Sequence, residues 1–186
     1  MNASPPLPAV LDANVLFPPS LRDVLLYSAA FRLFLPLWST EILEELRRNL
    51  VSDAGLTEDE AATQTRHMMQ AFPKAMRPVD AALAATLTNH PKDRHVLAVA
   101  ITAGAPVIVT QNVRDFPPAS LAGRGITVYD ADTFLCALLE EDPDRMATVI
   151  RFHAGQLRNP PQTPAQLVRT LSRHAPEFAR SVSGLL

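Results

Sequence analysis

The chain has a single cysteine among its 186 residues and no long apolar run. Cys136 alone excludes an intramolecular disulfide framework and favours a reducing compartment. A membrane span needs about 20 consecutive apolar residues, and a secretory leader needs a basic start before an apolar stretch. Neither pattern is seen in the sequence, so we expect a cytoplasmic protein with no membrane partner.

Several nucleotide-binding and metal-binding motifs are also missing. The sequence has no Gly-x-x-x-x-Gly-Lys-Ser/Thr loop and no dinucleotide fingerprint, which argues against a nucleotide-driven motor or a dehydrogenase. It has no internal repeat or low-complexity tract. Its five histidines lack metal-ligand spacing, so surface or structural roles are expected for His67, His90, His95, His153 and His174.

The chain is 47% hydrophobic, which is enough apolar sequence to form one hydrophobic core. We expect a main domain over residues 1–141 and a helical extension over 142–186. The net charge also differs between these two parts of the chain. The first 144 residues carry a balance of −7, whereas residues 145–186 carry six arginines and only Glu177. The basic tail is a candidate for contact with nucleic acid or with an acidic protein surface, and an ordinary solvated helical face is the simpler alternative.

Apolar periodicity and capping signals predict alternating helices and short β-rich runs. Strands are predicted at 7–11, 106–110 and 126–129, and helices at 21–34, 39–51, 57–72, 92–103 and 131–141. This alternation indicates a three-layer α/β/α fold with a central parallel sheet of four to five strands. In such sheets, ligands bind beyond the carboxyl ends of the strands.

Two acidic residues follow predicted strands. Asp12 ends the apolar run from Leu7, and Asp115 lies in the loop after the strand that ends near Thr110. Each has an ordinary explanation as well, because Asp12 suits an Asx turn and Asp115 precedes a Phe-Pro-Pro turn. Asn14 is an alternative turn residue to Asp12, and Asn112 competes with Asp115 for a place in a site. Thr110 is expected to hydrogen-bond either to Asp12 or to a bound phosphate.

Two further acidic residues lie on predicted helices. At about 100° per residue, Asp93 falls in the middle of the apolar face of its helix, where a carboxylate must be capped, paired or metal-bound. A helix N-cap is the alternative role for it. Glu45 lies nearest the apolar edge of its helix, whereas Glu41, the second choice, and Glu44 point further into solvent. All three glutamates also suit the first turns of a helix.

If the fold brings these four carboxylates together, they make an oxygen-only site. Such ligands suit Mg²⁺ or Mn²⁺ rather than zinc. One or two such ions activate a water and stabilise the leaving oxygen in phosphodiester hydrolysis. Four carboxylates without a cation would repel one another, so metal binding is expected to stabilise the fold.

At these residues the chain resembles the PIN-domain family of metal-dependent ribonucleases, which includes the VapC-type toxins of toxin–antitoxin operons. Four stretches carry the resemblance, within residues 7–135: Val10 to Leu16, Ser39 to Leu46, Asp93 to Ala100 and Val109 to Phe116. The resemblance implies Asp12, Glu45, Asp93 and Asp115 as catalytic metal ligands, with Thr110, Asn112 and Asn14 in support. Asn112 departs from the family pattern, since many relatives have an aspartate there.

The resemblance also implies a function and partners. It implies an endoribonuclease that uses Mg²⁺ or Mn²⁺, acts as a toxin, pairs with an antitoxin protein and forms homodimers. Arg94, Arg114 and Arg124 are candidates for contact with RNA phosphates. Two alternatives are an RNA-binding or regulatory protein of the same fold with little nuclease activity, and a housekeeping metal-dependent nuclease.

Overall fold

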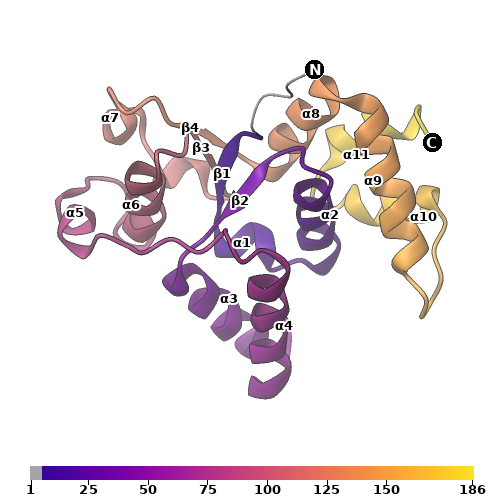
Figure 1. Ribbon diagram of the computed structural model, residues 1–186, viewed down its shortest axis with the longest axis horizontal. Coiled ribbons are helices and arrows are strands. Elements are labelled where there is room, and N and C mark those ends of the chain that lie inside the picture. Colours follow the sequence, from indigo (N-terminus) through magenta and orange to yellow (C-terminus); the bar gives the residue numbers. More distant parts are fainter. Residues whose placement is uncertain (1–5) are drawn as a thin grey trace.

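The computed structural model describes residues 6–186 as one sheet surrounded by helices (Figure 1). In chain order the elements are β1 (Pro8–Leu11), α1 (Ala13–Leu16), α2 (Pro19–Ala30), β2 (Leu35–Leu37), α3 (Thr40–Ser52), α4 (Glu58–Ala71), α5 (Ala81–Thr86), η1 (Pro91–Asp93), α6 (Arg94–Ala103), β3 (Val107–Val109), η2 (Val113–Asp115), α7 (Pro118–Leu121), β4 (Thr127–Tyr129), α8 (Ala131–Glu141), α9 (Pro143–Gln156), α10 (Pro164–Leu171) and α11 (Pro176–Ser183). The η elements are single 3₁₀ turns.

The sheet has four parallel strands in the order β2-β1-β3-β4. β1 pairs with β3 so that Leu11 lies opposite Val109, and β3 pairs with β4 so that Val109 lies opposite Tyr129. The two central strands are buried almost completely, as expected where helices cover both faces of a parallel sheet. The predicted α/β fold with a parallel sheet and C-terminal helices is confirmed.

One strand was absent from the prediction. The helix expected over residues 21–34 ends at Ala30, and Leu35–Leu37 then forms the edge strand β2. Pro36 pairs with Ala9 in this strand. Proline is tolerated here because it has no N–H to donate to the ladder and an edge strand leaves one side unpaired. A three-residue strand containing proline has too little alternation to be recognised from sequence.

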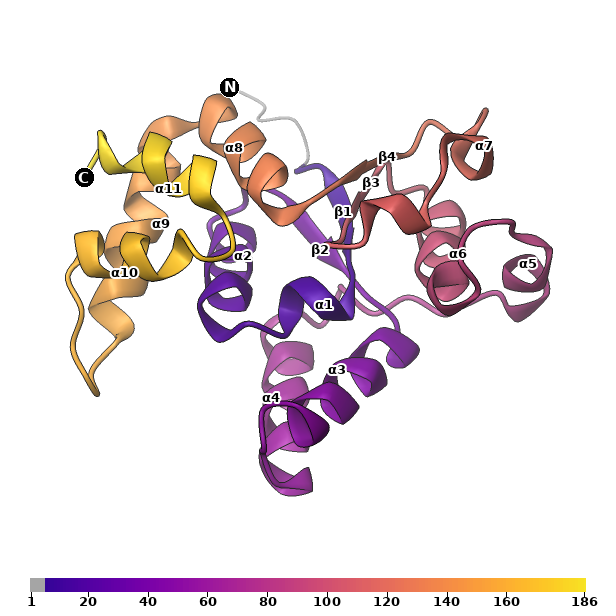
Figure 2. The same cartoon turned by 180° about the vertical axis from the view of Figure 1, so that it is seen from behind.

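The helices lie around the sheet in separate groups (Figures 1 and 2). α5 and α6 lie to one side of the sheet, α2 and the C-terminal helices to the other, and α3 and α4 form a projecting pair. Capping defines that pair, because the Ser39 hydroxyl caps α3 and Thr57 forms the predicted capping box with Glu60 at the start of α4. α3 and α6 also contact each other, which brings Glu45 toward the start of α6.

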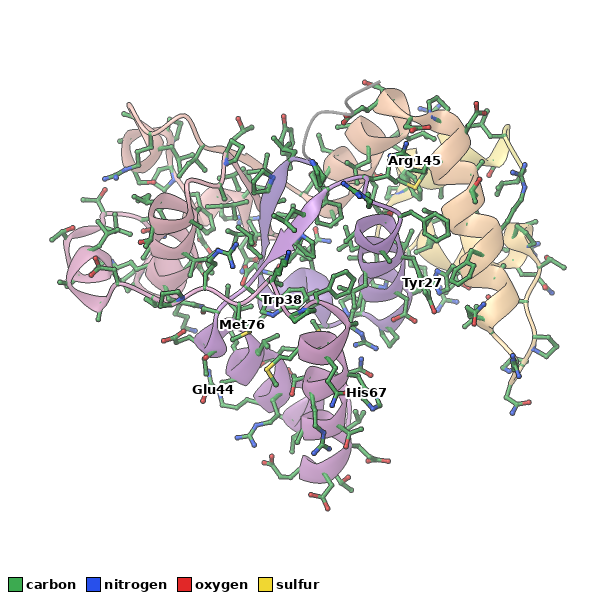
Figure 3. All side chains as sticks on the ribbon, in the orientation of Figure 1. Tyr27, Trp38, Glu44, His67, Met76 and Arg145 are labelled. Atoms are coloured by element: carbon green, nitrogen blue, oxygen red, sulfur yellow. The ribbon has the colours of Figure 1, made fainter. Side chains whose placement is uncertain are left out.

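Trp38 joins the projecting pair to the sheet. It is fully buried, makes a parallel bridge with Met76, and packs edge-on against Phe72 with ring centroids 5.9 Å apart. Figure 3 shows Trp38 and Met76 side by side above α3 and α4. This contact holds the C-terminal end of α4 close to β2, the strand that leads into α3.

The C-terminal helices pack against α2 and α8. Asp132 in α8 holds the N-terminus of α11 in place, because its carboxylate accepts hydrogen bonds from the backbone N–H groups of Glu177 (3.0 Å) and Phe178 (2.8 Å). The expected boundary between residues 141 and 142 falls between α8 and α9, and it stays a prediction. Over residues 6–186, no helix combines the length and the apolar character that crossing a membrane requires.

Candidate metal centre

Asp12 and Thr110 lie side by side at the carboxyl ends of the two central strands. The Asp12 N–H donates to the Val109 carbonyl at 3.0 Å, which extends the pairing of β1 with β3. The Thr110 hydroxyl then donates to Asp12 Oδ2 at 2.7 Å. Asn14 completes the arrangement, since its side-chain N–H₂ donates to the same Oδ2 at 2.7 Å and its carbonyl accepts from the Gln111 N–H at 2.9 Å.

These contacts leave one acceptor site of the Asp12 carboxylate free for another ligand. Asp12 is 1% exposed, and its Oδ1 accepts one hydrogen bond, from the Ala13 N–H at the start of α1. Because each carboxylate oxygen has two acceptor sites, Oδ2 is satisfied by two donors and Oδ1 keeps one site free. Burial raises the pKa of Asp12, while the hydrogen bonds from Thr110 and Ala13 oppose that rise. A cation near Oδ1 would also oppose it.

Asp93 is the most perturbed carboxyl group of the site. It stands at the N-terminal end of α6 and is 6% exposed, yet its side chain accepts no capping hydrogen bond from the described N–H groups of that helix. Burial, followed by the negative charges of Asp12 and Asp115, raises its pKa to about 7. The capping role that could have explained a carboxylate here is therefore not observed.

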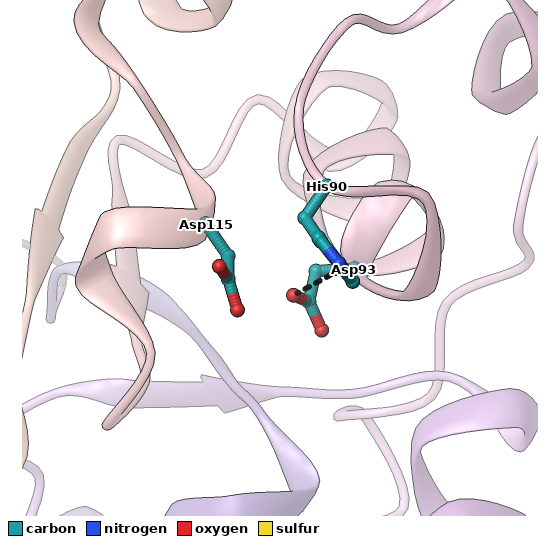
Figure 4. A group of neighbouring side chains, drawn as sticks. All are labelled: His90, Asp93 and Asp115. Atoms are coloured by element: carbon teal, nitrogen blue, oxygen red, sulfur yellow. Dashed lines mark ion pairs between the residues drawn. The ribbon is translucent and has the colours of Figure 1, made fainter.

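Asp115 reaches the site from the 3₁₀ turn η2, on the opposite side from Asp93 (Figure 4). Its carboxylate lies against that of Asp93, with His90 as a third neighbour. Ligand atoms of the three residues all lie within 4.8 Å of one another. Asn112, the competing residue, is exposed, and its backbone N–H donates to the Thr110 hydroxyl at 3.1 Å.

Glu45 approaches from α3 and is half-buried, whereas Glu41 and Glu44 are exposed. Burial, and then the negative charge of Asp12, raises its pKa, while His95 opposes the rise. Glu45 Oε2 lies 3.8 Å from His95 Nε2, too far for a direct hydrogen bond, and that buried nitrogen has no hydrogen-bond partner among residues 6–186.

A hollow of about 510 Å³ extends from Glu45 along α3. Its lining residues are all polar or charged: Glu41, Glu44, Glu45, Arg48, Asn49, Lys92 and His95. The positive charges of Arg48 and Lys92 oppose the rise in the Glu45 pKa, so both lie close to the acidic cluster. The hollow adjoins the acidic cluster through Glu45, the one of the four acids that lines it.

The arginines expected to contact RNA occupy different places. Arg114 is exposed on η2 beside Asp115, and Arg94, next to Asp93, donates through Nε to the Asn89 carbonyl at 3.4 Å. Arg124 instead lines a hollow with Pro106 and Ile126, which precede β3 and β4. It therefore lies at the amino-terminal edge of the sheet, opposite the acidic cluster.

Four polar residues near the cluster are not among the site residues expected from the sequence: His90, His95, Arg48 and Lys92. A local signal existed for three of them. His90 precedes Asp93 by three residues, Arg48 follows Glu45 by three, and Lys92 adjoins Asp93. The approach of His95 to Glu45 has no such signal, because it depends on how α6 packs against α3.

The donors present suit a hard divalent cation. Burial, and then the negative charges of neighbouring carboxylates, raise the pKa of Asp93 and of Glu45, and a bound cation would oppose both rises. Carboxylate oxygens at the end of a parallel sheet are typical Mg²⁺ or Mn²⁺ ligands, and among the described residues Asp12, Glu45, Asp93 and Asp115 are placed to supply them.

Comparison with known proteins agrees with this geometry. The PIN domain family matches residues 8–114, more than half of the chain, and the VapC50 C-terminal domain family matches residues 131–184. The chain is also 38% identical over 97 residues to a protein of Mycobacterium tuberculosis named "Putative ribonuclease VapC50". That match covers 52% of this chain and 57% of the relative, so it spans little more than half of either. This chain belongs to the PIN-domain family.

Proposed function

We propose that this protein is a metal-dependent endoribonuclease that acts as the toxin of a toxin–antitoxin pair. The observation that carries the proposal is the convergence of three carboxyl groups, those of Asp12, Asp115 and Glu45, around Asp93, whose pKa is raised to about 7. A buried carboxyl group that lies among three others and accepts no capping hydrogen bond experiences electrostatic repulsion, which a bound cation would relieve. The ribonuclease name of the relative supports the substrate class.

In this proposal Asp12, Asp93, Asp115 and Glu45 hold the ion. When bound, a divalent ion lowers the pKa of a coordinated water and neutralises charge on the scissile phosphate. Thr110 and Asn14 orient Asp12 by donating to Oδ2, and Oδ1, which accepts only from the Ala13 N–H, keeps a free acceptor site for the ion. Asp93 needs to lose its proton before it can hold a cation, and its pKa is raised to about 7 in the metal-free protein, so metal affinity increases with pH.

Substrate affinity comes from cations around the acidic cluster. Arg48 and Lys92 flank the hollow beside Glu45, and Arg114 is exposed next to Asp115. These side chains neutralise RNA phosphates, so binding weakens as salt concentration rises. The protein partner in this proposal is an antitoxin that blocks the site, and the working unit is a homodimer, as in the toxins of this family.

The direct test is cleavage of labelled RNA by the purified protein with Mg²⁺, with Mn²⁺ and with a chelator. Wild-type protein is expected to cleave with either metal and not with the chelator. Asp12→Asn and Asp93→Asn should each lose cleavage and growth inhibition in cells. Asp144→Asn, an exposed change on α9, is the matched control and should behave as wild type.

Two outcomes would redirect the proposal. Salt-sensitive RNA binding without cleavage under any metal would favour the regulatory alternative of the same fold. Metal-dependent cleavage without growth inhibition would favour a housekeeping nuclease. Growth inhibition that persists in both the Asp12 and Asp93 variants would overturn the toxin mechanism.

A further inference from the structure

We propose that His90 is a ligand of the metal centre and makes the site prefer Mn²⁺ over Mg²⁺. This inference rests on the proposed function and adds to it a nitrogen donor that the family pattern of carboxylates does not include. His90 Nδ1 lies 3.7 Å from Asp93 Oδ2, and one ligand atom each from His90, Asp93 and Asp115 all lie within 4.8 Å of one another (Figure 4). The three side chains point into one space from two separate turns of the chain.

The spacing of these donors suits a shared ion. With bonds of about 2.0–2.1 Å, two ligands on opposite sides of an octahedral ion lie about 4.2 Å apart and adjacent ligands about 3 Å apart. The observed separations, up to 4.8 Å, are slightly larger than these values. The half-exposed His90 ring has room to close the difference by a small rotation. Direct hydrogen bonding explains the cluster less well, because 3.7 Å is too long for a hydrogen bond.

The backbone holds His90 in this place. Its N–H donates to the Asp115 carbonyl at 3.0 Å, and its own carbonyl accepts from the Asp93 N–H at 2.9 Å. The turn carrying His90 and Asp93 is thereby fastened to η2, which carries Asp115. His90 thus faces the cluster because of backbone bonding that is independent of any ion pair with Asp93.

The nature of the donor sets the metal preference. Mg²⁺ favours oxygen ligands and retains its waters, whereas imidazole nitrogen binds first-row transition metals more readily. A site of carboxylates alone therefore distinguishes Mn²⁺ from Mg²⁺ less than the same site with one imidazole. A surface ion pair between His90 and Asp93, the alternative role, would contribute little and would leave metal binding unchanged.

Titration calorimetry with Mn²⁺ and with Mg²⁺, in the absence of RNA, tests the inference. His90→Ala is expected to lower Mn²⁺ affinity at least about tenfold, the size of effect seen even for groups that only support a metal ligand. Mg²⁺ affinity should fall much less, so the ratio of Mn²⁺ affinity to Mg²⁺ affinity should decrease. His67→Ala is the matched control, an exposed histidine on α4 away from the site, and should leave both affinities unchanged (Figure 3).

Pulsed electron paramagnetic resonance of the Mn²⁺-loaded protein identifies the nitrogen donor. Wild-type protein should show coupling of Mn²⁺ to an imidazole nitrogen, His90→Ala should lose it, and His95→Ala should keep it. Unchanged Mn²⁺ affinity in His90→Ala, or coupling that disappears only in His95→Ala, would overturn the inference. Neither result affects the proposed function, which fails instead if wild-type protein binds Mn²⁺ but cleaves no RNA.

Discussion

The Thr110 hydroxyl donates a 2.7 Å hydrogen bond to Asp12 Oδ2, joining residues 98 positions apart at the ends of adjacent strands. Thr110 is fully buried, and its hydroxyl oxygen also accepts from the Asn112 N–H and the Asn14 side chain. The Thr110 side chain therefore orients the Asp12 carboxylate and also holds the start of the loop that leads to Asp115.

Replacing Thr110 with valine removes these bonds while keeping the shape of the side chain. We expect Thr110→Val to destabilise the fold by about 1–3 kcal/mol, because buried polar groups lose their partner. Metal affinity should fall at least about tenfold, since the Asp12 pKa rises further. Urea unfolding and calorimetry measure the two effects. Thr102→Val, an exposed change on α6, is the control, and an equal loss in that variant would contradict the explanation.

The stability of the metal-free protein should fall as pH rises toward neutrality. The pKa of Asp93 is raised to about 7 from an unfolded value of 3.8, so the folded state binds more protons between these values. Stability is therefore greatest below about pH 4 for this group and is lost by about pH 7. Asp93→Asn should make the stability of the protein depend less on pH. Added Mn²⁺ should stabilise wild type but not the variant at pH 8. Thermal unfolding at pH 5 and 8 provides the comparison.

His153 should have the opposite dependence. It is 1% exposed, and burial lowers its pKa to about 4 from 6.5, so the unfolded state binds more protons in that interval. Its contribution to stability is present above pH 6.5 and is lost as pH falls toward 4. We expect His153→Gln to be less stable than wild type at pH 7 but to lose less stability on acidification. His174→Gln, at an exposed position, should retain the wild-type slope in urea titrations at pH 7 and 5.

The Asp132 carboxylate should stabilise the seating of α11. Asp132→Ala removes the acceptor for two N–H groups at the start of that helix and should destabilise the protein by about 1–2 kcal/mol, as for loss of an N-cap. Hydrogen exchange should increase first in residues 176–183. Asp144→Ala, exposed on α9, is the control. Uniform exchange across all helices in the Asp132 variant would contradict a local role.

Much of the acidic cluster could be recognised from local sequence. Helical angles alone placed Asp93 on a buried face and Glu45 nearer the core than its two neighbours, and the structure agrees with both burials. Strand ends placed Asp12 and Thr110 at the same edge of the sheet. Such inferences succeed because the repeat of a helix or strand fixes which side chains share a face.

The histidines show where that reasoning stops. No spacing marks His90 or His95 as a ligand. His90 is exposed, as expected for a surface residue, but it lies next to Asp93 and Asp115, and His95 lies 3.8 Å from Glu45. The edge strand β2 was absent for a related reason, since three residues with a central proline are recognised only through the partner strand.

The sequence by itself determined the class of fold, the burial of the chosen acids and the chemistry of an oxygen-rich site, because these follow from periodicity and residue type. Only the tertiary structure decided which groups meet. The structure selects Asp12 from the two partners expected for Thr110, brings the backbone of His90 to Asp115 and packs α6 against α3, and each contact joins segments far apart in the chain. Such contacts arise from packing, which no local pattern encodes.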